Sequence, residues 1–234
     1  LKRSKFVIVT SLDYGMHSRV AHSFSNKMVE ASAPAKDYYN ANECFSHPSK
    51  PTIGFCGRIV EEKGIDVLLR AYSLIRKKGF DCNLVIGGDY KKVAGGSIYN
   101  QLQEIIQKES IDGVRFLGMV PDDKMGGFYK SLDVFVLPSI NSLEAYGMVQ
   151  MEAMLCGTPV VATDLYGVRT IVQKTGMGVV VKKNDELSLA DGIMEVLNNK
   201  EKYIVDRSKI FSTVGTQKCI HVYEQCFKEC VESK

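Results

Sequence analysis

Two cations lie in a glycine-bounded turn about a quarter of the way along the chain. Gly57, Arg58, Lys63 and Gly64 belong to the segment GRIVEEKG, which follows a strand-like run and precedes a helical pattern. Backbone N–H groups and cations in such a turn can bind one anion, most naturally phosphate, at the carboxyl edge of a sheet. A glycine turn with two solvated cations is an equally open interpretation. The segment matches neither GxxxxGK[ST] nor GxGxxG, which disfavours a nucleoside triphosphatase and a dinucleotide-dependent dehydrogenase.

Two carboxylates separated by seven residues form the second candidate site, within the segment LEAYGMVQMEA. If a helix begins near Gly147, Glu144 lies just before its positive end and Glu152 lies on the following turns, so both can face one crevice. Carboxylates accept hydrogen bonds from vicinal hydroxyls of a sugar or a ribose. The free N–H groups from Ala145 to Met148 would add donors for a diphosphate. The alternative is a solvated glutamate and a helix-stabilising glutamate on the surface.

These residues must be positioned by an alternation of strands and helices that begins at residue 51. Such alternation is typical of βαβ units on a parallel sheet, so we predict an α/β fold. The expected strands cover residues 52–56, 83–86, 114–117, 133–137 and 159–162. The expected helices include a segment around residues 67–75, then 98–108, 124–130, 148–156, 185–198 and 213–231.

Composition excludes several other classes of protein. The 234 residues are 45% hydrophobic and 24% charged, as in an ordinary globular protein, and the net charge of +3 is too small to indicate a nucleic-acid or lipid partner. No apolar run approaches the ~18 residues of a membrane span, so we expect a cytoplasmic protein. The seven cysteines are interpreted as buried hydrophobes in a reducing compartment. Cys226 and Cys230 lack the partners that would complete four ligands, so no metal is expected.

The first fifty residues differ from the rest. Residues 6–9, a helix around residues 16–24, and residues 28–31 would form one additional βαβ-like element, and a polar segment follows it. The chain begins at Leu1 with no room for a signal peptide, so its start is interpreted as a cut. We therefore expect residues 1–35 to be the edge of another domain that this chain mostly lacks, and residues 36–50 to be a linker.

Five motifs in a fixed order carry a resemblance: GRIVEEKG, VRFLGMV, SLDVFVLPS, the two glutamates of EAYGMVQME, and AMLCGTPVVATD. Over residues 51–200 the chain resembles the donor-binding half of a retaining, metal-independent glycosyltransferase of the GT-B fold, in family 4 or group 1. The resemblance implies a Rossmann-like doubly wound parallel sheet. It divides the chain into a remnant of the amino-terminal acceptor domain (1–35), the linker, a nucleotide-sugar-binding domain (51–212) and a helix that packs back on the first domain (213–234).

The same resemblance implies roles for single residues. Arg58 and Lys63 would bind the leaving diphosphate in place of a metal, and no Asp-x-Asp occurs in the chain. Glu144 would bind the hydroxyls of the donor sugar. Glu152 would bind those of the ribose. The remaining implied donor-binding positions are Gly57, the base-binding backbone of Met119 and Val120, and the phosphate-binding backbone of Ala145, Tyr146, Gly147 and Met148.

Two features depart from the family pattern. The turn after Asp164 has one glycine instead of two, and Arg169 adds a cation there that we leave outside the predicted site. The histidine that relatives use near the reacting sugar has no counterpart. His17 and His22 would share an amphipathic helix and are interpreted as surface or packing residues.

The expected function is metal-independent, retaining transfer of a hexosyl group from a UDP- or GDP-sugar, with no further cofactor, in polysaccharide or glycoconjugate biosynthesis. The acceptor is not predicted. This chain alone would be weakly active or inactive without its amino-terminal domain, supplied in cis or in trans, and any membrane association would come through that absent part. The alternatives are a non-catalytic nucleotide-sugar-binding subunit and a GT-B epimerase. A phosphorylase would need a pyridoxal phosphate lysine that the sequence does not show.

Overall fold

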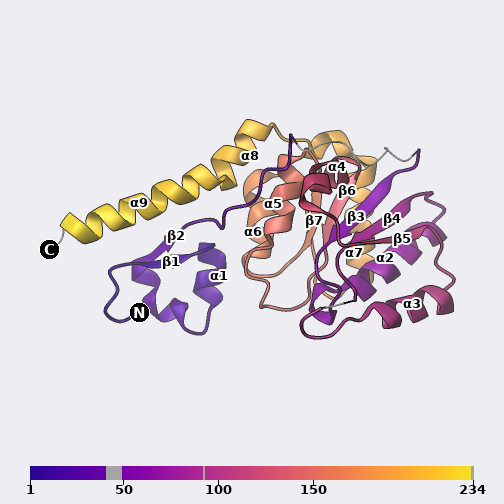
Figure 1. The fold of residues 1–234 in the computed structure, drawn as a ribbon, viewed down its shortest axis with the longest axis horizontal. Helices are drawn as coiled ribbons and strands as arrows, with labels where there is room; N and C mark the ends of the chain where they lie inside the picture. Colours follow the sequence, from indigo (N-terminus) through magenta and orange to yellow (C-terminus); the bar gives the residue numbers. More distant parts are fainter. Residues whose placement is uncertain (41–48, 92, 233–234) are drawn as a thin grey trace.

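A computed structural model describes residues 1–40, 49–91 and 93–232 of the chain. A large α/β domain is accompanied by a small amino-terminal unit and by a long helix that lies beside that unit (Figure 1). The expected linker lies partly outside the described residues, at positions 41–48.

Six parallel strands form the sheet of the large domain, in the order β5-β4-β3-β6-β7-β8. The five predicted strands are confirmed with small shifts at their ends, and β8 adds a sixth. Helices cover both faces of the sheet, so strands such as β6 are continuous apolar runs instead of alternating ones. The strands are β3 (Thr52–Cys56), β4 (Asn83–Gly87), β5 (Val114–Gly118), β6 (Val134–Leu137), β7 (Val160–Thr163) and β8 (Gly178–Val181).

Two hydrophobic clusters lie on the two faces of the sheet. On β6, Val134 and Val136 belong to one cluster, and Phe135 and Leu137 to the other, because successive strand side chains point to opposite faces. The predicted doubly wound α/β fold is thereby confirmed. The first face is covered by α2 (Ile65–Lys77), α3 (Tyr99–Lys108) and α7 (Glu186–Asn198), and the second by α4 (Met125–Lys130), α5 (Met148–Leu155), α6 (Val168–Thr175) and α8 (Arg207–Val214).

The strand order reverses between β3 and β6. The chain passes from β3 to β4 and β5 on one side and returns to β6 on the other side of β3. Ligands of open α/β sheets bind at such a reversal, outside the carboxyl ends of the strands. The turns after both strands meet there, since the Ile140 N–H donates to the Glu62 carbonyl at 3.0 Å. Gly64 permits this approach: its φ is +63°, and a Cβ would lie 2.2 Å from the Pro138 carbonyl oxygen.

The amino-terminal unit contains a parallel pair of strands, β1 (Val7–Val9) and β2 (Met28–Glu30), around two short helices. The prediction of one helix around residues 16–24 is wrong. Helix α1 (Leu12–His17) ends where Ser18 becomes extended, and a separate 3-10 helix covers Ala21–Lys27. The Ser18 hydroxyl accepts from the Ala21 N–H at 3.2 Å and so begins a new turn.

The predicted final helix begins three residues later than expected. Thr213 and Val214 belong to α8, and α9 covers Thr216–Glu232. Gly215 separates the two helices with an extended backbone, while its N–H closes α8 on the Phe211 carbonyl at 2.8 Å. Glycine favours such a break because it loses more conformational freedom in a helix than other residues.

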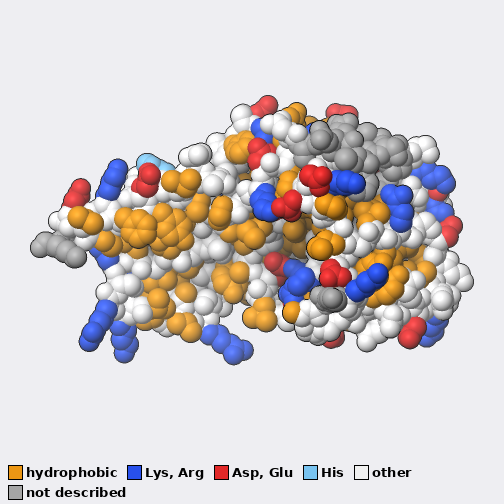
Figure 2. Space-filling view, in the orientation of Figure 1, with side chains coloured by type: hydrophobic (Ala, Val, Ile, Leu, Met, Phe, Trp, Pro, Cys, Tyr) orange, Lys and Arg blue, Asp and Glu red, His pale blue; other side chains and the backbone are white. Residues whose placement is uncertain are grey.

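Helix α9 extends away from the large domain along the amino-terminal unit (Figure 1). The Lys5 Nζ donates to the Glu229 carbonyl at 2.7 Å. Cys219 and Cys226 are buried, whereas Phe227 and Val231 are exposed, and Figure 2 shows apolar side chains gathered over this part of the molecule. No helix among the described residues has the length and apolar character of a membrane span.

Candidate functional site

Both cations of the first motif lie in the turn between β3 and α2. Lys63 ends a 3-10 helix that precedes Gly64, and Arg58 follows the end of β3. The Arg58 guanidinium is half exposed and lies 2.5 Å from a carboxylate oxygen of Glu62. Arg58 is therefore held at the rim of the crevice by an exposed ion pair that another anion can replace.

Backbone donors in this turn are largely used within the fold. The Gly57 N–H donates to the Gly87 carbonyl at 3.0 Å, and the Gly64 N–H donates to the Glu61 carbonyl at 3.0 Å. The Lys63 N–H likewise donates to the Val60 carbonyl. We predicted that backbone N–H groups of this turn could bind an anion. These three are not available for it, because sheet pairing and the 3-10 turn use them.

Glu144 lies directly across the crevice from Lys63. The two side chains form an ion pair, and the Ser139 hydroxyl donates to the same carboxylate at 3.2 Å. Each side chain of the ion pair is only 18% exposed. The tertiary fold thus brings Lys63 and Glu144 together. From the sequence, we expect them to bind neighbouring parts of a donor, the diphosphate and the sugar.

Backbone donors are available at the start of α5. Gly147 precedes this helix with φ +72°, and a Cβ there would lie 2.4 Å from the Leu137 side chain. Within the described part of the chain, the N–H groups of Ala145, Tyr146, Gly147 and Met148 have no acceptor. The Tyr146 side chain is buried, and burial raises its pKa to about 12. At Tyr146, therefore, the backbone N–H is available to a ligand and the buried side chain is not.

Glu152 lies on the second turn of α5 and takes partners different from those of Glu144. The Tyr129 hydroxyl donates to its carboxylate at 2.8 Å. Burial raises the pKa of Glu152, although hydrogen bonds from Tyr129 and the Lys36 backbone partly offset this effect. The two carboxylates share the carboxyl edge of the sheet but have no common partner among the described residues.

The expected base-binding loop follows β5 at the same edge. The Gly88 N–H donates to the Gly118 carbonyl at 2.8 Å, which ties this loop to the end of β4. The Met119 side chain is 75% exposed, and Val120 packs partly against the second hydrophobic cluster. Neither residue has a backbone hydrogen bond within the described ranges, so the fold leaves their amides and carbonyls unused there.

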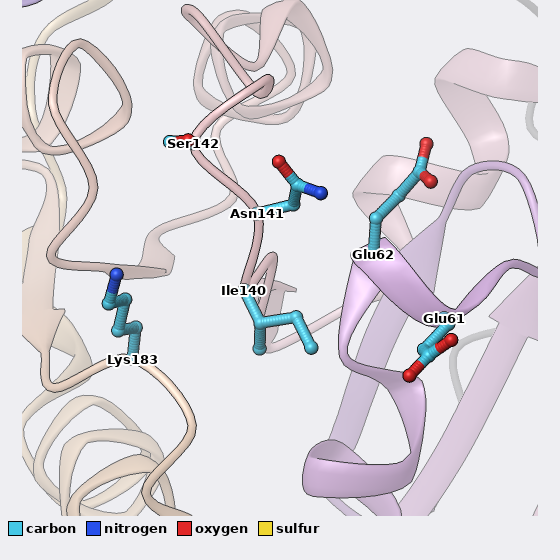
Figure 3. Close-up of a pocket in the computed structure, with 6 residues that line it drawn as sticks. All are labelled: Glu61, Glu62, Ile140, Asn141, Ser142 and Lys183. Atoms are coloured by element: carbon cyan, nitrogen blue, oxygen red, sulfur yellow. The ribbon is translucent and has the colours of Figure 1, made fainter.

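Two cavities adjoin the crevice. The one around the ion pair has a volume of about 210 Å³ and is lined by Arg58, Glu62, Lys63, Asn141, Leu143 and Glu144. A larger cavity of about 490 Å³, shown in Figure 3, is lined by Glu61, Glu62, Ile140, Asn141, Ser142 and Lys183. Glu62 and Asn141 line both cavities, whereas Met119, Val120 and Glu152 line neither.

Asn141 and Leu143 line the ion-pair cavity but were not predicted from the sequence. The Asn141 side-chain oxygen accepts the Leu143 N–H at 2.9 Å, and its carbonyl accepts the Glu144 N–H at 3.1 Å. Asn141 thus shapes the loop that presents Glu144. The available signal was an asparagine–serine pair shortly after a strand ended by proline, which is typical of a turn.

Arg169 is not part of this crevice. Its guanidinium donates to both carboxylate oxygens of Asp13, at 2.7 and 2.9 Å, and to Asp164 at 2.8 Å. The Gly167 N–H also donates to Asp13 at 2.9 Å. Burial raises the pKa of Asp13, but the hydrogen bonds from Arg169 and Gly167 outweigh it and leave the pKa below its ordinary value. Arg169 therefore binds the amino-terminal unit to the large domain.

The described cysteines form no disulfide, and the described side chains form no cluster of metal ligands. The six described cysteines are free thiols, and burial raises the pKa of Cys56 and Cys156 to about 12. No group of three or more His, Cys, Asp and Glu side chains there is arranged to hold a metal ion. The raised pKa values keep the Cys56 and Cys156 thiols protonated at neutral pH.

A parallel sheet with helices on both faces, and a cation-lined crevice where the strand order reverses, defines the Rossmann-like class of nucleotide-binding domains. A family model described as Glycosyl transferases group 1 matches residues 41–208. The chain belongs to this family.

Curated relatives agree with this assignment. An uncharacterized glycosyltransferase of Methanocaldococcus jannaschii is 30% identical over 75% of this chain and 47% of its own length. A D-inositol 3-phosphate glycosyltransferase of Corynebacterium jeikeium is 33% identical over 74% of this chain and 43% of its own length. The chain spans less than half the length of these two relatives.

Solved glycosyltransferases of the GT-B type share the fold. Sucrose-phosphate synthase from Thermosynechococcus elongatus has a TM-score of 0.83 and 22% identity, with coverage of 100% of this chain and 60% of its own. The Anabaena protein HepE, solved in complex with UDP-glucose, has a TM-score of 0.75 and 19% identity, with coverage of 99% and 64%.

Proposed function

We propose that this chain is the donor-binding half of a glycosyltransferase that uses a nucleoside diphosphate sugar. The observation that carries the proposal is the Lys63–Glu144 pair in a cavity at the strand-order reversal. Unpaired backbone donors at the start of α5 lie in the same loop region, among the described residues. One cation, one carboxylate and free amides together suit a ligand that joins a diphosphate to a polyhydroxylated ring.

Arg58 and Lys63 supply the countercharge for the leaving diphosphate in this proposal. Arg58 lies at the exposed rim and Lys63 at the enclosed end of the same cavity. Fixed cations in a partly dehydrated site stabilise the charge that develops on the leaving group. Metal-independent transfer is therefore part of the proposal.

The two glutamates bind different hydroxyls of the donor. Glu144 lies in the cavity with Lys63, next to the diphosphate, and so binds the donor sugar. Glu152 lies deeper along α5 and binds the ribose, since a carboxylate has about four acceptor positions and can keep its bond to Tyr129. The backbone of Met119 and Val120, which makes no hydrogen bond among the described residues, binds the base.

The reaction is transfer of a hexosyl group with retention of anomeric configuration. The bond between the anomeric carbon and the diphosphate oxygen breaks, and its electron pair leaves with the diphosphate. An acceptor hydroxyl attacks the oxocarbenium-like centre from the same face, and its proton passes to a diphosphate oxygen. An amino-terminal domain completes the acceptor side, in cis or in trans, and the protein acts in the cytoplasm.

Thermal unfolding with nucleotides tests the donor site directly. UDP is the first candidate because HepE was solved with UDP-glucose, and GDP and ADP, each also as a sugar conjugate, complete the panel. A ligand at ~100 times its Kd adds ~2.7 kcal/mol to the free energy of unfolding. We expect stabilisation by one base series, lost in Lys63→Ala and kept in Lys77→Ala at the far end of α2. Absence of any shift would contradict the proposal for this chain.

A further inference from the structure

Tyr129 places a buried hydroxyl on one of the two glutamates of the crevice. Its side chain is fully buried, and its hydroxyl donates to Oε2 of Glu152 at 2.8 Å. Burial and then the charge of Glu152 raise the pKa of Tyr129 well above its ordinary value. The phenol therefore stays protonated, so Tyr129 is the donor of this hydrogen bond and Glu152 is the acceptor.

Neighbours from three segments hold the Tyr129 ring in place. The rings of Phe128, on α4, and Phe135, on β6, each contact it edge to face, with centroids 5.5 Å from its own. The Thr158 hydroxyl, in the turn before β7, donates to the Tyr129 carbonyl at 2.7 Å. A ring packed in this way gives its hydroxyl one position, and the hydrogen bond passes that position on to the carboxylate that accepts it.

Glu152 keeps acceptor positions that the fold does not use. Within the described ranges, Tyr129 is the side chain that donates to Glu152, and it is neutral. Lys36 and Tyr38 lie close enough to act on the charge of this region, but the Lys36 ammonium pairs with Asp122 and the Tyr38 hydroxyl donates to Asp122 at 3.3 Å. A carboxylate has about four acceptor positions, so Glu152 can still accept from neutral hydroxyl donors.

We propose that Tyr129 is a positioning residue that makes the donor site selective for ribonucleotides over 2′-deoxyribonucleotides. The inference rests on the proposed function, in which Glu152 binds the ribose. The Tyr129 hydroxyl fixes Oε2 and leaves Oε1 to accept from the ribose 2′-hydroxyl. An acceptor that is held in place stays unpaired when this hydroxyl is absent, which costs affinity, whereas an acceptor that can turn finds water instead.

Titration calorimetry of the 234-residue chain with UDP and 2′-deoxy-UDP tests this role, and GDP and ADP with their 2′-deoxy forms cover other bases. We expect the unmodified chain to prefer the ribonucleotide at least about tenfold, and Tyr129→Phe to reduce this preference to about threefold or less. The matched control is Tyr203→Phe, which removes a hydroxyl that donates to Glu195 at 2.8 Å near the end of α7 and should leave the preference unchanged. In Glu152→Gln, where the preference is already reduced, adding Tyr129→Phe should reduce it no further.

The pH dependence of the same preference separates positioning from a purely structural role. Burial raises the pKa of Glu152, and the hydrogen bond from Tyr129 partly offsets this rise, so removing the hydroxyl should raise the pKa further. As pH is lowered, the preference should therefore decline at a higher pH in Tyr129→Phe than in the unmodified chain. The ratio of the two affinities cancels the titration of the diphosphate itself. Tyr129→Phe leaves in place the other titratable groups near Glu152, which are Lys36, Tyr38, Cys56, Asp122 and Cys156.

The outcomes distinguish the two proposals. If no nucleotide binds, the proposed function fails. If both forms bind equally well to the unmodified chain and Lys63→Ala weakens both, the ribose selectivity is wrong while the diphosphate site stands. If Tyr129→Phe keeps the preference and its pH profile, Tyr129 only packs the core and the positioning role is wrong. Should Tyr129→Phe not fold, Tyr129→3-fluorotyrosine, which keeps the hydroxyl as a stronger donor, has to extend the preference to lower pH, and an unchanged profile would overturn the proposal.

Discussion

Lys63 and Glu144 neutralise each other across the crevice although they lie 81 residues apart in the sequence. With each side chain only 18% exposed, neither charge is well solvated, so each depends on the other. In the proposed function, a diphosphate that enters this cavity would compete with Glu144 for Lys63. The sugar attached to that diphosphate would then offer hydroxyl donors to Glu144 in exchange.

Lys63→Ala removes the cation that the proposal places against the diphosphate. Loss of a charge-assisted contact to the diphosphate should weaken UDP binding by about 1.5–3 kcal/mol, while uridine, which has no phosphate, should bind nearly as before. Titration calorimetry of both ligands measures the difference, with Lys77→Ala as a control for the loss of one positive charge. Equal weakening of uridine and UDP would contradict the assigned role of Lys63.

Glu144→Gln separates the sugar from the diphosphate. The substitution keeps the size of the side chain but releases Lys63 from its ion pair. Binding of UDP should therefore be unchanged or tighter, and binding of the intact UDP-sugar should become weaker. The ratio of the two dissociation constants is the measurement. If Glu144→Gln weakens UDP as much as UDP-sugar, the two carboxylates are wrongly assigned.

Glu152 should make stability depend on pH. Burial raises its pKa above the ordinary 4.5, so the folded state binds its proton more tightly than the unfolded state. The free energy of unfolding should then fall as pH rises from below 4.5 through the raised pKa. In Glu152→Gln, which cannot ionise, this fall should be smaller. Denaturant unfolding of both proteins across this pH range measures it, and parallel curves would exclude the effect.

At the scale of the elements, α1 and α6 are joined by Asp13 and Arg169, whose side chains are only 22% and 23% exposed. A second ion pair, Glu30–Lys174, joins β2 to the same helix. These contacts explain why the amino-terminal unit, with only two strands, has a definite position beside the large domain. A two-stranded sheet alone is marginally stable and needs such support.

A double-mutant cycle tests this connection. Asp13→Ala, Arg169→Ala and the double variant should show a coupling free energy of about 1–3 kcal/mol in chemical unfolding. The exposed Lys78–Asp191 pair, studied in the same way, should show a value near zero. Because the pKa of Asp13 is lowered in the folded state, the coupling is present above pH ~3.8 and is lost as pH falls through the folded pKa. Similar values for the two pairs would refute the connection.

At the scale of the whole molecule, the cavity around the Lys63–Glu144 pair belongs to a chain that spans less than half the length of its first curated relatives. We expect this chain to bind the donor but to transfer little sugar, because efficient reaction requires that the acceptor and the donor are held in the correct relative position. Turnover of a labelled UDP-sugar should be roughly a hundredfold lower for this chain than for a protein that also contains an amino-terminal domain. Equal turnover would contradict this expectation.

Local pattern alone determined much of this protein. The strands were predictable because a sheet covered on both faces needs short, continuous apolar runs, and glycine or proline ends several of them. The turn with Lys63 and the helix start at Gly147 were equally predictable, since both depend on neighbours in the sequence. The errors at Ser18 and Gly215 arose where single residues divided an otherwise helical pattern.

Only the tertiary structure decided which charges meet. Lys63 could have faced solvent, and Arg169 could have entered the crevice; instead one pairs with Glu144 and the other with Asp13, 156 residues away. The physical reason is that an ion pair depends on the approach of separate segments, and that approach is set by strand order and by close backbone contacts such as Gly64 with Pro138. Sequence spacing describes a helix turn or a strand, but it does not describe the distance between them.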